Sequence, residues 1–291
     1  MKQPKIDIMI VGAQKAGTSS LAQYLDVHPE VVTHEALEMT YFVREEEYQA
    51  GYEVAFDLYF PHHQPGRKVL AKSVGVMYLP QAIERLKEHN PHVQVVATLR
   101  DPVKRAYSAY WYARRTGYET LDTFEKALAA EAERLSAGGD VQHTAYLHRG
   151  YYAEQIENLY QHFERDQVHI IVLDDLKGRS EEVVAELLPK LGLSATVELK
   201  ATETVHNASA AAKFEGVARF MAQGSPLKRA VRKLVPKKLR AKVRSTVKNL
   251  NEKEFTPPPI ASETEQRLCA QLRPEVEKLE ALLGRDLSGW K

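Results

Sequence analysis

Cysteine is almost absent from this chain of 291 residues, because Cys269 is the only one. A single cysteine excludes an internal disulfide framework and any metal site built from several thiolates. Long apolar runs are also missing, and none approaches the roughly 18 residues that a membrane-spanning helix needs. A strong excess of one charge is absent as well, since the formal net charge is +1. This balance disfavours a general nucleic-acid-binding protein.

The amino-terminal apolar segment bears on cellular location. Residues 6–11 are too short for a secretory leader, and they include Asp7. Together with the single cysteine, this pattern is typical of a reducing compartment. We therefore expect a soluble, cytoplasmic protein that has no nucleic-acid partner.

Short runs of β-branched residues alternate with helical stretches over about the first 200 residues. The expected strands are 6–11, 68–72, 93–99 and 168–173. The expected helices are 19–27, 80–89, 103–115, 121–136, 151–165 and 181–191. This alternation predicts an α/β fold, in which a P-loop-like parallel sheet carries helices on both faces. Ligands bind such sheets at the carboxyl ends of the strands.

The last third of the chain has a different composition, and no strand is expected after about residue 208. Segment 228–248 contains ten Lys or Arg and no acid, and Pro236 divides it into two expected helices. The prolines at 257–259 predict a stiff, extended spacer. A last helix is expected over 263–283.

We expect one domain over residues 1–291, with an α/β core in about 1–200 and a helical, basic extension in about 201–291. The basic segment 228–248 has three interpretations. It is a solvated pair of helices, a surface that helps to hold an anionic substrate, or a peripheral contact with an anionic membrane surface. The oligomeric state is left open.

A glycine-bounded loop joins the first expected strand to the first expected helix. Its sequence is Gly12-Ala13-Gln14-Lys15-Ala16-Gly17-Thr18-Ser19. Glycine permits the tight turn, and the first N–H groups and the dipole of the helix attract an anion. The loop therefore predicts a phosphate-binding site. In a nucleoside-triphosphatase loop the lysine follows the second glycine directly, but here Thr18 takes that place and the lysine is Lys15.

An arginine follows the third expected strand. Arg100 closes an apolar run before Asp101-Pro102, and Ser108 comes two helical turns later. An arginine in this position can bind a phosphate through two parallel hydrogen bonds. Ser108 could donate to the same group from the following helix.

A glutamate and a lysine in two further segments are also candidate site residues. Glu38 precedes the aromatic pair Tyr41-Phe42, and Lys72 ends the second expected strand. We expect surface or packing roles for four histidines that lack the spacing of metal ligands, namely His28, His34, His143 and His206.

Taken together, these segments resemble the sulfotransferases that use 3′-phosphoadenosine-5′-phosphosulfate (PAPS), and most closely the heparan-sulfate-type branch and its bacterial relatives. The loop of that family, Gly-x-x-Lys-x-Gly-Thr-[Ser/Thr], is matched in full. The resemblance covers about residues 6–193, with an echo in 279–290. It implies that the 5′-phosphosulfate of PAPS is bound by Lys15, Ala16, Gly17, Thr18 and Ser19.

The same resemblance implies roles for the other segments. Arg100 and Ser108 would bind the 3′-phosphate of PAPS. Glu38 would be the catalytic base, with Lys72 and Lys15 as the other catalytic residues. PAPS would be the co-substrate and adenosine 3′,5′-bisphosphate (PAP) its product, and no metal is expected.

The chain departs from the family pattern close to the expected base. Leu37 replaces the lysine that usually precedes the glutamate, and Thr40 replaces a histidine that several relatives have. A late loop rich in glycine and lysine is not evident. These differences affect what can be inferred about the acceptor and about closure of the site more than what can be inferred about the donor.

The expected reaction is in-line transfer of a sulfuryl group from PAPS to a hydroxyl, or as second choice an amine, of a saccharide or small-metabolite acceptor. By analogy with phosphoryl transfer, positioning and electrostatic stabilisation are expected to supply most of the catalysis. One alternative is a P-loop kinase or nucleoside triphosphatase that uses ATP and Mg²⁺, in which Asp174-Asp175 would support the metal. Another is a non-enzymatic adaptor whose basic helices bind a polyanion.

Overall fold

The computed structural model describes residues 3–138, 141–195, 210–212, 252–254 and 256–290. The basic segment 228–248 and His206 lie outside the described residues, so the predictions about them stay predictions. The chain divides into two compact units. The first comprises Met1–Asp101, Tyr151–His206 and Leu272–Lys291, and the second comprises Pro102–Gly150 and Asn207–Gln271. That these units act as one functional domain stays a prediction.

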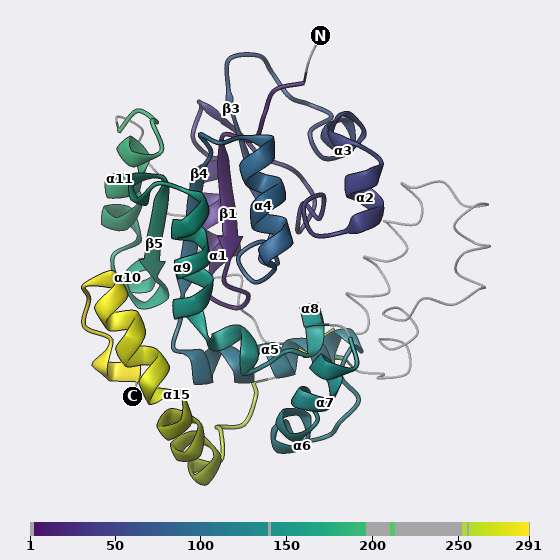
Figure 1. Cartoon of the computed structure of the whole chain (residues 1–291), viewed down its shortest axis with the longest axis vertical. Helices are drawn as coiled ribbons and strands as arrows, with labels where there is room; N and C mark the ends of the chain where they lie inside the picture. Colours follow the sequence, from purple (N-terminus) through teal and green to yellow (C-terminus); the bar gives the residue numbers. More distant parts are fainter. Residues whose placement is uncertain (1–2, 139–140, 196–209, 213–251, 255, 291) are drawn as a thin grey trace, which may run out of the picture. The chain divides into compact units, whose positions relative to one another are not determined.

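A five-stranded parallel sheet forms the centre of the first unit (Figure 1). Its strands are β1 (Ile8–Gly12), β2 (Val31–Val32), β3 (Lys68–Lys72), β4 (Gln94–Leu99) and β5 (Val168–Val172). They lie in the order β2-β3-β1-β4-β5, and all neighbours are parallel. The predicted α/β parallel sheet is confirmed. Strand β2 was missed because two residues cannot show a period of two.

The helices of the first unit lie between these strands in the sequence. They are α1 (Thr18–Asp26), α2 (Glu45–Gln49), α3 (Tyr52–Tyr59), α4 (Pro80–His89), α9 (Tyr152–His162), α10 (Leu173–Gly178) and α11 (Ser180–Lys190), with the 3₁₀ turns Arg165–Gln167 and Ser288–Trp290. Of these, α1, α4, α9 and α11 match predicted helices to within a few residues. Helix α2 has five residues, which is too few to show a helical period.

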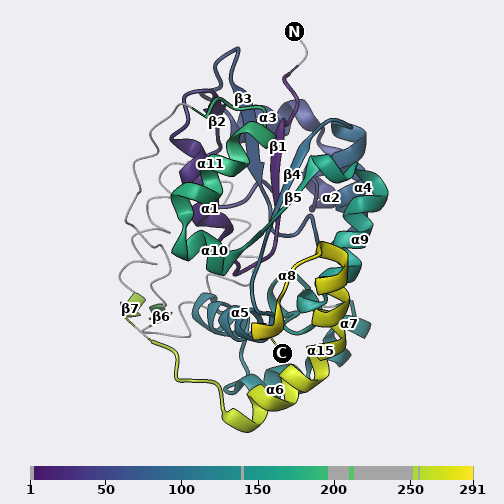
Figure 2. The ribbon, with the colours of Figure 1, turned by 90° about the vertical axis from the view of Figure 1, so that its left-hand side faces the viewer.

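Alternation along β1 gives each face of the sheet its helices. Ile8 and Ile10 belong to the apolar cluster that α1 and α11 share. Met9 and Val11 point to the opposite face, and they belong to the cluster of α4 and α9. Figure 2 shows α1, α10 and α11 on one side of the strands, with α4 and α9 on the other. The sheet is thus covered on both faces, as parallel strands require.

The second unit is mainly helical. It contains α5 (Pro102–Thr116), α6 (Phe124–Ala129), α7 (Glu131–Ser136), α8 (Val141–Thr144), a 3₁₀ turn (His148–Gly150), β6 (Ala210–Ala212) and β7 (Glu252–Glu254). Helix α15 (Ser262–Leu283) begins in this unit and ends in the first. The predicted helix 121–136 is divided at Ala130.

Strands β6 and β7 pair antiparallel, so the expectation of no strand after about residue 208 is wrong for these two segments. Their sequences, Ala-Ala-Ala and Glu-Lys-Glu, do not alternate apolar with polar residues. Neither segment therefore carries the usual signal of a strand.

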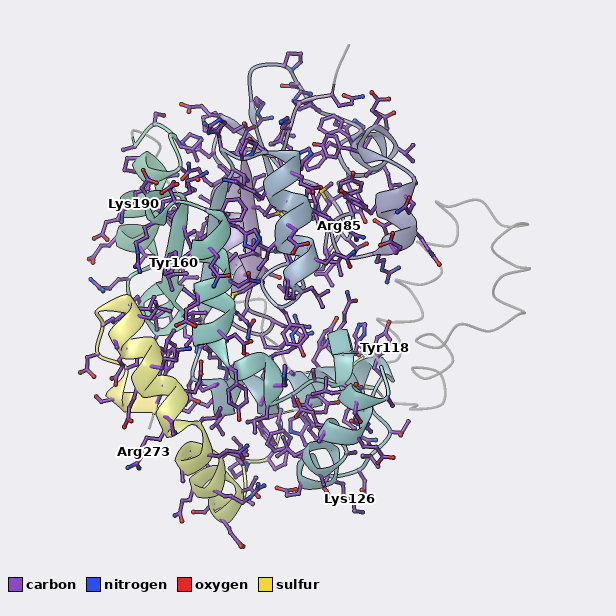
Figure 3. The ribbon with its side chains drawn as sticks, viewed as in Figure 1. Arg85, Tyr118, Lys126, Tyr160, Lys190 and Arg273 are labelled. Atoms are coloured by element: carbon purple, nitrogen blue, oxygen red, sulfur yellow. The ribbon has the colours of Figure 1, made fainter. Side chains whose placement is uncertain are left out.

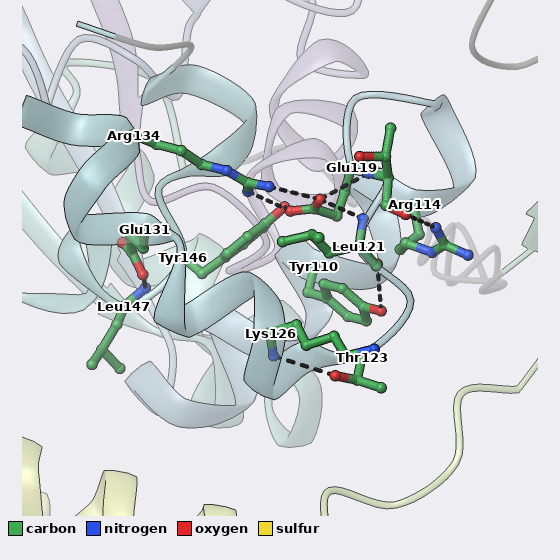
Figure 4. Close-up of polar contacts among 11 residues, drawn as sticks. Tyr110, Arg114, Glu119, Leu121, Thr123, Lys126, Glu131, Arg134, Tyr146 and Leu147 are labelled. Atoms are coloured by element: carbon green, nitrogen blue, oxygen red, sulfur yellow. Dashed lines mark hydrogen bonds and ion pairs between the residues drawn. The ribbon is translucent and has the colours of Figure 1, made fainter. Parts of the chain in front are cut away.

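A buried carboxylate organises the helices of the second unit (Figure 4). The side chain of Glu119 is fully buried. It accepts hydrogen bonds from Arg134 at 2.6 and 3.0 Å and from the Tyr146 hydroxyl at 2.8 Å. The N–H groups of Thr120 and Leu121 also donate to it, each at 2.8 Å. Burial alone would raise the pKa of Glu119, but these hydrogen bonds together lower it.

Candidate functional site

The glycine-bounded loop connects β1 to α1 at the carboxyl end of the sheet. Gly17, which precedes α1, has a φ of 88° and lies in the left-handed region. A Cβ atom added there would lie 2.5 Å from Cδ1 of Leu173 in α10. Backbone conformation and packing both require glycine at this position. Because the first N–H groups of a helix have no acceptor within it, this end of α1 suits an anion.

Strand β4 and the residue after it hold the loop in place. The N–H of Ala13 donates to the carbonyl of Thr98 at 2.7 Å. Arg100 donates from Nη1 to the carbonyl of Lys15 at 3.3 Å. Burial lowers the pKa of Arg100 from its ordinary value, although an arginine in a protein stays protonated. A guanidinium group therefore lies directly beside the loop.

Glu38 and Lys72 form an ion pair next to the same loop. Lys72 Nζ lies 2.7 Å from Glu38 Oε1, and it donates to Ser19 Oγ at 3.4 Å. The lysine side chain is 7% exposed, whereas the glutamate side chain is 23% exposed. The structure thus brings three residues named from the sequence into contact, with the carboxylate on the more open side.

The register of the sheet explains this contact. Lys72 ends β3 and pairs with Ile10 near the end of β1, so its side chain comes close to the loop that follows β1. The second oxygen of Glu38 accepts the N–H of Val74 at 2.7 Å. The N–H of Met39 donates to the carbonyl of Lys72 at 2.8 Å. The segment that carries Glu38 is therefore attached to the end of β3 through both side chain and main chain.

The other predicted residues are distributed over both units. Ala16 and Thr18 are buried in the loop and in the first turn of α1. Ser108 is half-buried on α5 in the second unit. Its expected contact with a 3′-phosphate stays a prediction.

Comparison with known families assigns the chain to one of them. A family profile described as a sulfotransferase domain matches residues 5–252, which is most of the chain. The chain belongs to the sulfotransferase family. The predicted sulfotransferase family is thereby confirmed.

Individual relatives are distant in sequence. A bifunctional heparan sulfate N-deacetylase/N-sulfotransferase 1 of Caenorhabditis briggsae is 26% identical over 201 residues, which cover 64% of this chain and 22% of that protein. A heparan sulfate glucosamine 3-O-sulfotransferase 5 of Mus musculus is 25% identical over 185 residues, covering 64% and 51%. The chain thus spans about a fifth to a half of the length of such relatives.

A solved structure agrees over the whole length of this sulfotransferase-family chain. The crystal structure of a sulfotransferase from Alicyclobacillus acidocaldarius is 25% identical, with a TM-score of 0.72, and the match covers 99% of each chain. The similarity therefore takes in both compact units.

One histidine contacts the candidate site although the sequence predicted only a surface or packing role for it. Nε2 of His34 accepts the N–H of Lys72 at 3.0 Å, and Nδ1 donates to the carbonyl of Ala36 at 2.8 Å. In the sequence His34 lies four residues before Glu38, and this short separation is the only sequence signal that links it to the site. Hydrogen bonds between a loop histidine and main-chain groups cannot be recognised from amino-acid composition or from the spacing of apolar residues.

Thr40, two residues after Glu38, belongs to a second polar group. Its hydroxyl donates to Glu47 Oε1 at 2.7 Å, and the hydroxyl of Tyr59 donates to Glu47 Oε2 at 2.9 Å. The N–H of Thr40 donates to the Tyr59 oxygen at 3.2 Å. These contacts fix the main chain two residues after Glu38 to α2 and α3.

Arg85 of α4 secures the next part of the segment (Figure 3). It donates to the carbonyl of Phe42 at 3.3 Å and forms an ion pair with Glu45. Its guanidinium carbon lies 4.0 Å from the centre of the Tyr48 ring. The chain on the carboxyl side of Glu38 is therefore fixed to three helices.

A cavity of about 810 Å³ lies elsewhere, between β5 and α11, and its lining includes none of the predicted site residues. Within the described part of the sulfotransferase, no group of three or more His, Cys, Asp or Glu side chains could hold a metal ion. Among the same residues, no helix is both long and apolar enough to span a membrane.

Proposed function

We propose that the chain transfers a sulfuryl group from PAPS to a hydroxyl, or as second choice an amine, of a saccharide or small-metabolite acceptor. One observation carries the proposal: a carboxylate and an ammonium group 2.7 Å apart lie beside a glycine-bounded helix start, with the ammonium 3.4 Å from Ser19. A base for an acceptor proton and cations for a phosphosulfate are thus available in one place.

The residues fit the donor. Gly17 allows the left-handed turn that packs the loop against Leu173 of α10, and the start of α1 suits a 5′-phosphosulfate. Lys15, Ala16, Gly17, Thr18 and Ser19 would hold that group. Arg100 and Ser108 would hold the 3′-phosphate. When bound, PAPS supplies an activated sulfuryl group whose leaving group is a phosphate.

Glu38 is proposed to accept the proton of the acceptor hydroxyl, since its carboxylate is the more exposed partner of the pair. Lys72 offsets negative charge on the oxygens of the transferring group and keeps Glu38 oriented. Lys15 offsets the charge that develops on the leaving group. Positioning and charge, rather than a covalent intermediate, then supply the rate acceleration.

A triphosphatase mechanism is less well supported by the same structure. Asp174 and Asp175 lie in the first turn of α10, not at the end of β5. Asp175 forms a 2.7 Å ion pair with Arg285, and this hydrogen bond lowers its pKa. A carboxylate committed to an arginine is a poor candidate for the support of Mg²⁺.

Transfer of radiolabelled sulfuryl groups tests the proposal. The full chain is incubated with ³⁵S-labelled PAPS and a panel of acceptors: an N-acetylglucosamine oligosaccharide, 4-nitrophenol, a long-chain primary alcohol and benzylamine. We expect label in at least one hydroxyl acceptor, with chelator present. Labelling of benzylamine alone would assign an amine acceptor instead. Transfer to none of the panel, together with hydrolysis of ATP that needs Mg²⁺, would contradict the proposal.

A further inference from the structure

The imidazole of His34 lies between two main-chain groups. The carbonyl of Ala36, 2.8 Å from Nδ1, can only accept, so Nδ1 carries the proton. The N–H of Lys72, 3.0 Å from Nε2, can only donate, so Nε2 is unprotonated. The two partners therefore select a single neutral tautomer.

The surroundings of His34 favour this neutral form. Burial, the largest cause, lowers its pKa to about 4, and the Lys72 ammonium acts in the same direction, while Asp26 of α1 acts against it. Tyr59 and Phe60 pack edge-on against the ring, with centroids 5.8 Å away. A proton on Nε2 would point toward the Lys72 N–H and break that hydrogen bond. Near neutral pH the contact is therefore maintained.

Lys72 is held from three sides by one short segment. Its N–H binds His34, its carbonyl accepts from Met39, and its ammonium group binds Glu38. The segment 34–39 is thus bound to the end of β3 at both of its ends, through His34 and through Met39. The lone pair of His34 Nε2 is used in this closure, so His34 is available neither as a base nor as a metal ligand.

We propose that His34 is a positioning residue for sulfuryl transfer. By fixing the main chain of Lys72, it sets the Glu38–Lys72 pair relative to the glycine-bounded loop. This inference rests on the proposed function, because the pair has to be aligned only if it acts on a bound donor and acceptor. A misplacement of about 1 Å in such a pair can cost about 10²-fold in rate.

Two substitutions separate the Lys72 contact from the Ala36 contact. In His34→Gln, the side-chain oxygen lies as many bonds from Cβ as Nε2 does, so it can accept the Lys72 N–H. In His34→Asn, the amide reaches only as far as Nδ1 and can bind Ala36 alone. We expect His34→Asn to lower kcat for transfer from PAPS about 10–100-fold, and His34→Gln to recover most of that loss.

His89 provides a matched control outside the site. It is also a half-buried histidine whose Nε2 accepts a main-chain N–H, that of Ile6 at 3.0 Å, and burial likewise lowers its pKa to about 4. His89→Asn should lower the midpoint of thermal unfolding and leave kcat unchanged. If His34→Asn and His89→Asn reduce kcat equally, the effect is one of stability and the proposal is wrong.

Three further measurements separate this inference from the proposed function. Calorimetric titration with PAP should give the same affinity for wild type and His34→Asn, because the donor contacts are intact. Nitrogen-15 NMR of the imidazole at pH 7 should show the Nδ1–H tautomer of His34, and amide exchange at Lys72 should be faster in His34→Asn than in His34→Gln. If wild type neither binds PAP nor transfers label, the proposed function fails, and the inference fails with it. If wild type transfers label and His34→Asn has the same kcat, only the inference is overturned.

Discussion

Lys72 is the residue on which most contacts of the candidate site converge. Its side chain is 7% exposed, and a buried ammonium group is costly unless it is paired and hydrogen-bonded. Glu38 and Ser19 provide those partners at 2.7 and 3.4 Å. The need to pair this charge fixes the position of Glu38, which lies in a segment without regular structure.

Replacement of the proposed base tests its role directly. In Glu38→Gln the size and the acceptor for Val74 N–H are kept, but the capacity to take a proton is lost. We expect turnover to fall by about 10²–10⁴-fold, with PAP affinity unchanged within about twofold. Glu35→Gln is the matched control, since this loop acid is almost fully exposed. Full turnover by Glu38→Gln would remove the assignment.

Gly17 is expected to be irreplaceable for two separate reasons, its φ of 88° and the 2.5 Å approach of Leu173. Gly17→Ala should lower the free energy of unfolding by about 2–4 kcal/mol and should weaken PAP binding at least tenfold. Gly66→Ala is the control, because Gly66 has the same φ with nothing within 4 Å of an added Cβ. There we expect about 1 kcal/mol of strain and normal PAP binding. Equal PAP affinities for both variants would show that the loop conformation is not required.

The residues of the candidate site differ in how well the sequence alone predicts that they belong to it. The glycine-bounded loop and Arg100 follow from strand ends and glycine spacing, which are local patterns. Glu38 and Lys72 are 34 positions apart, and only a family resemblance linked them before the structure. His34 could not be assigned to the site, because its partners are main-chain groups that any residue could supply.

At the scale of elements, long apolar strands and helices were the predictable part. β1, β3, β4 and β5 were found because both faces of the sheet are buried and their runs are nearly continuous. β2, β6 and β7 were missed because each has only two or three residues, and α2 was missed because five residues are too few to show a helical period. β2 and α2 nevertheless flank the segment that carries His34 and Glu38, so part of the candidate site lies between elements that the sequence does not reveal.

The helices of the second unit depend on the carboxylate of Glu119. Glu119→Gln removes the charge that Arg134, Tyr146 and two N–H groups share. We expect a loss of about 3 kcal/mol in the free energy of unfolding, measured with urea. Asp122→Asn is the control, because Asp122 contacts Lys126 at the surface. The unfolding midpoint of this variant should equal that of the wild type. Equal midpoints for the two variants would contradict a central role for Glu119.

At the scale of the whole molecule, half-buried neutral histidines make stability depend on pH. Burial lowers the pKa of His34 and of His89 to about 4 in the folded chain, against about 6.5 for an unfolded histidine. The unfolded chain therefore binds more protons between about pH 4 and 6.5, and stability falls as the pH drops through that range. His169 acts in the same direction.

From pH 7 to pH 5 we expect each of these two histidines to contribute a loss of about 1–2 kcal/mol in the free energy of unfolding. Urea unfolding at pH 7, 6 and 5 measures the slope of the free energy of unfolding against pH. The double variant with His34→Gln and His89→Gln cannot be protonated at these positions, so its slope should be much smaller. A double variant with the slope of the wild type would show that the histidines are not the cause.

The glycine-bounded loop and Arg100 are proposed to bind the nucleotide of PAPS without a metal. Calorimetric titration of the full chain with PAP in the presence of chelator, run beside ATP with Mg²⁺, tests this binding. We expect tight binding of PAP that is insensitive to chelator and is weakened at least tenfold by Arg100→Ala. Binding of ATP alone, and only with Mg²⁺, would contradict it.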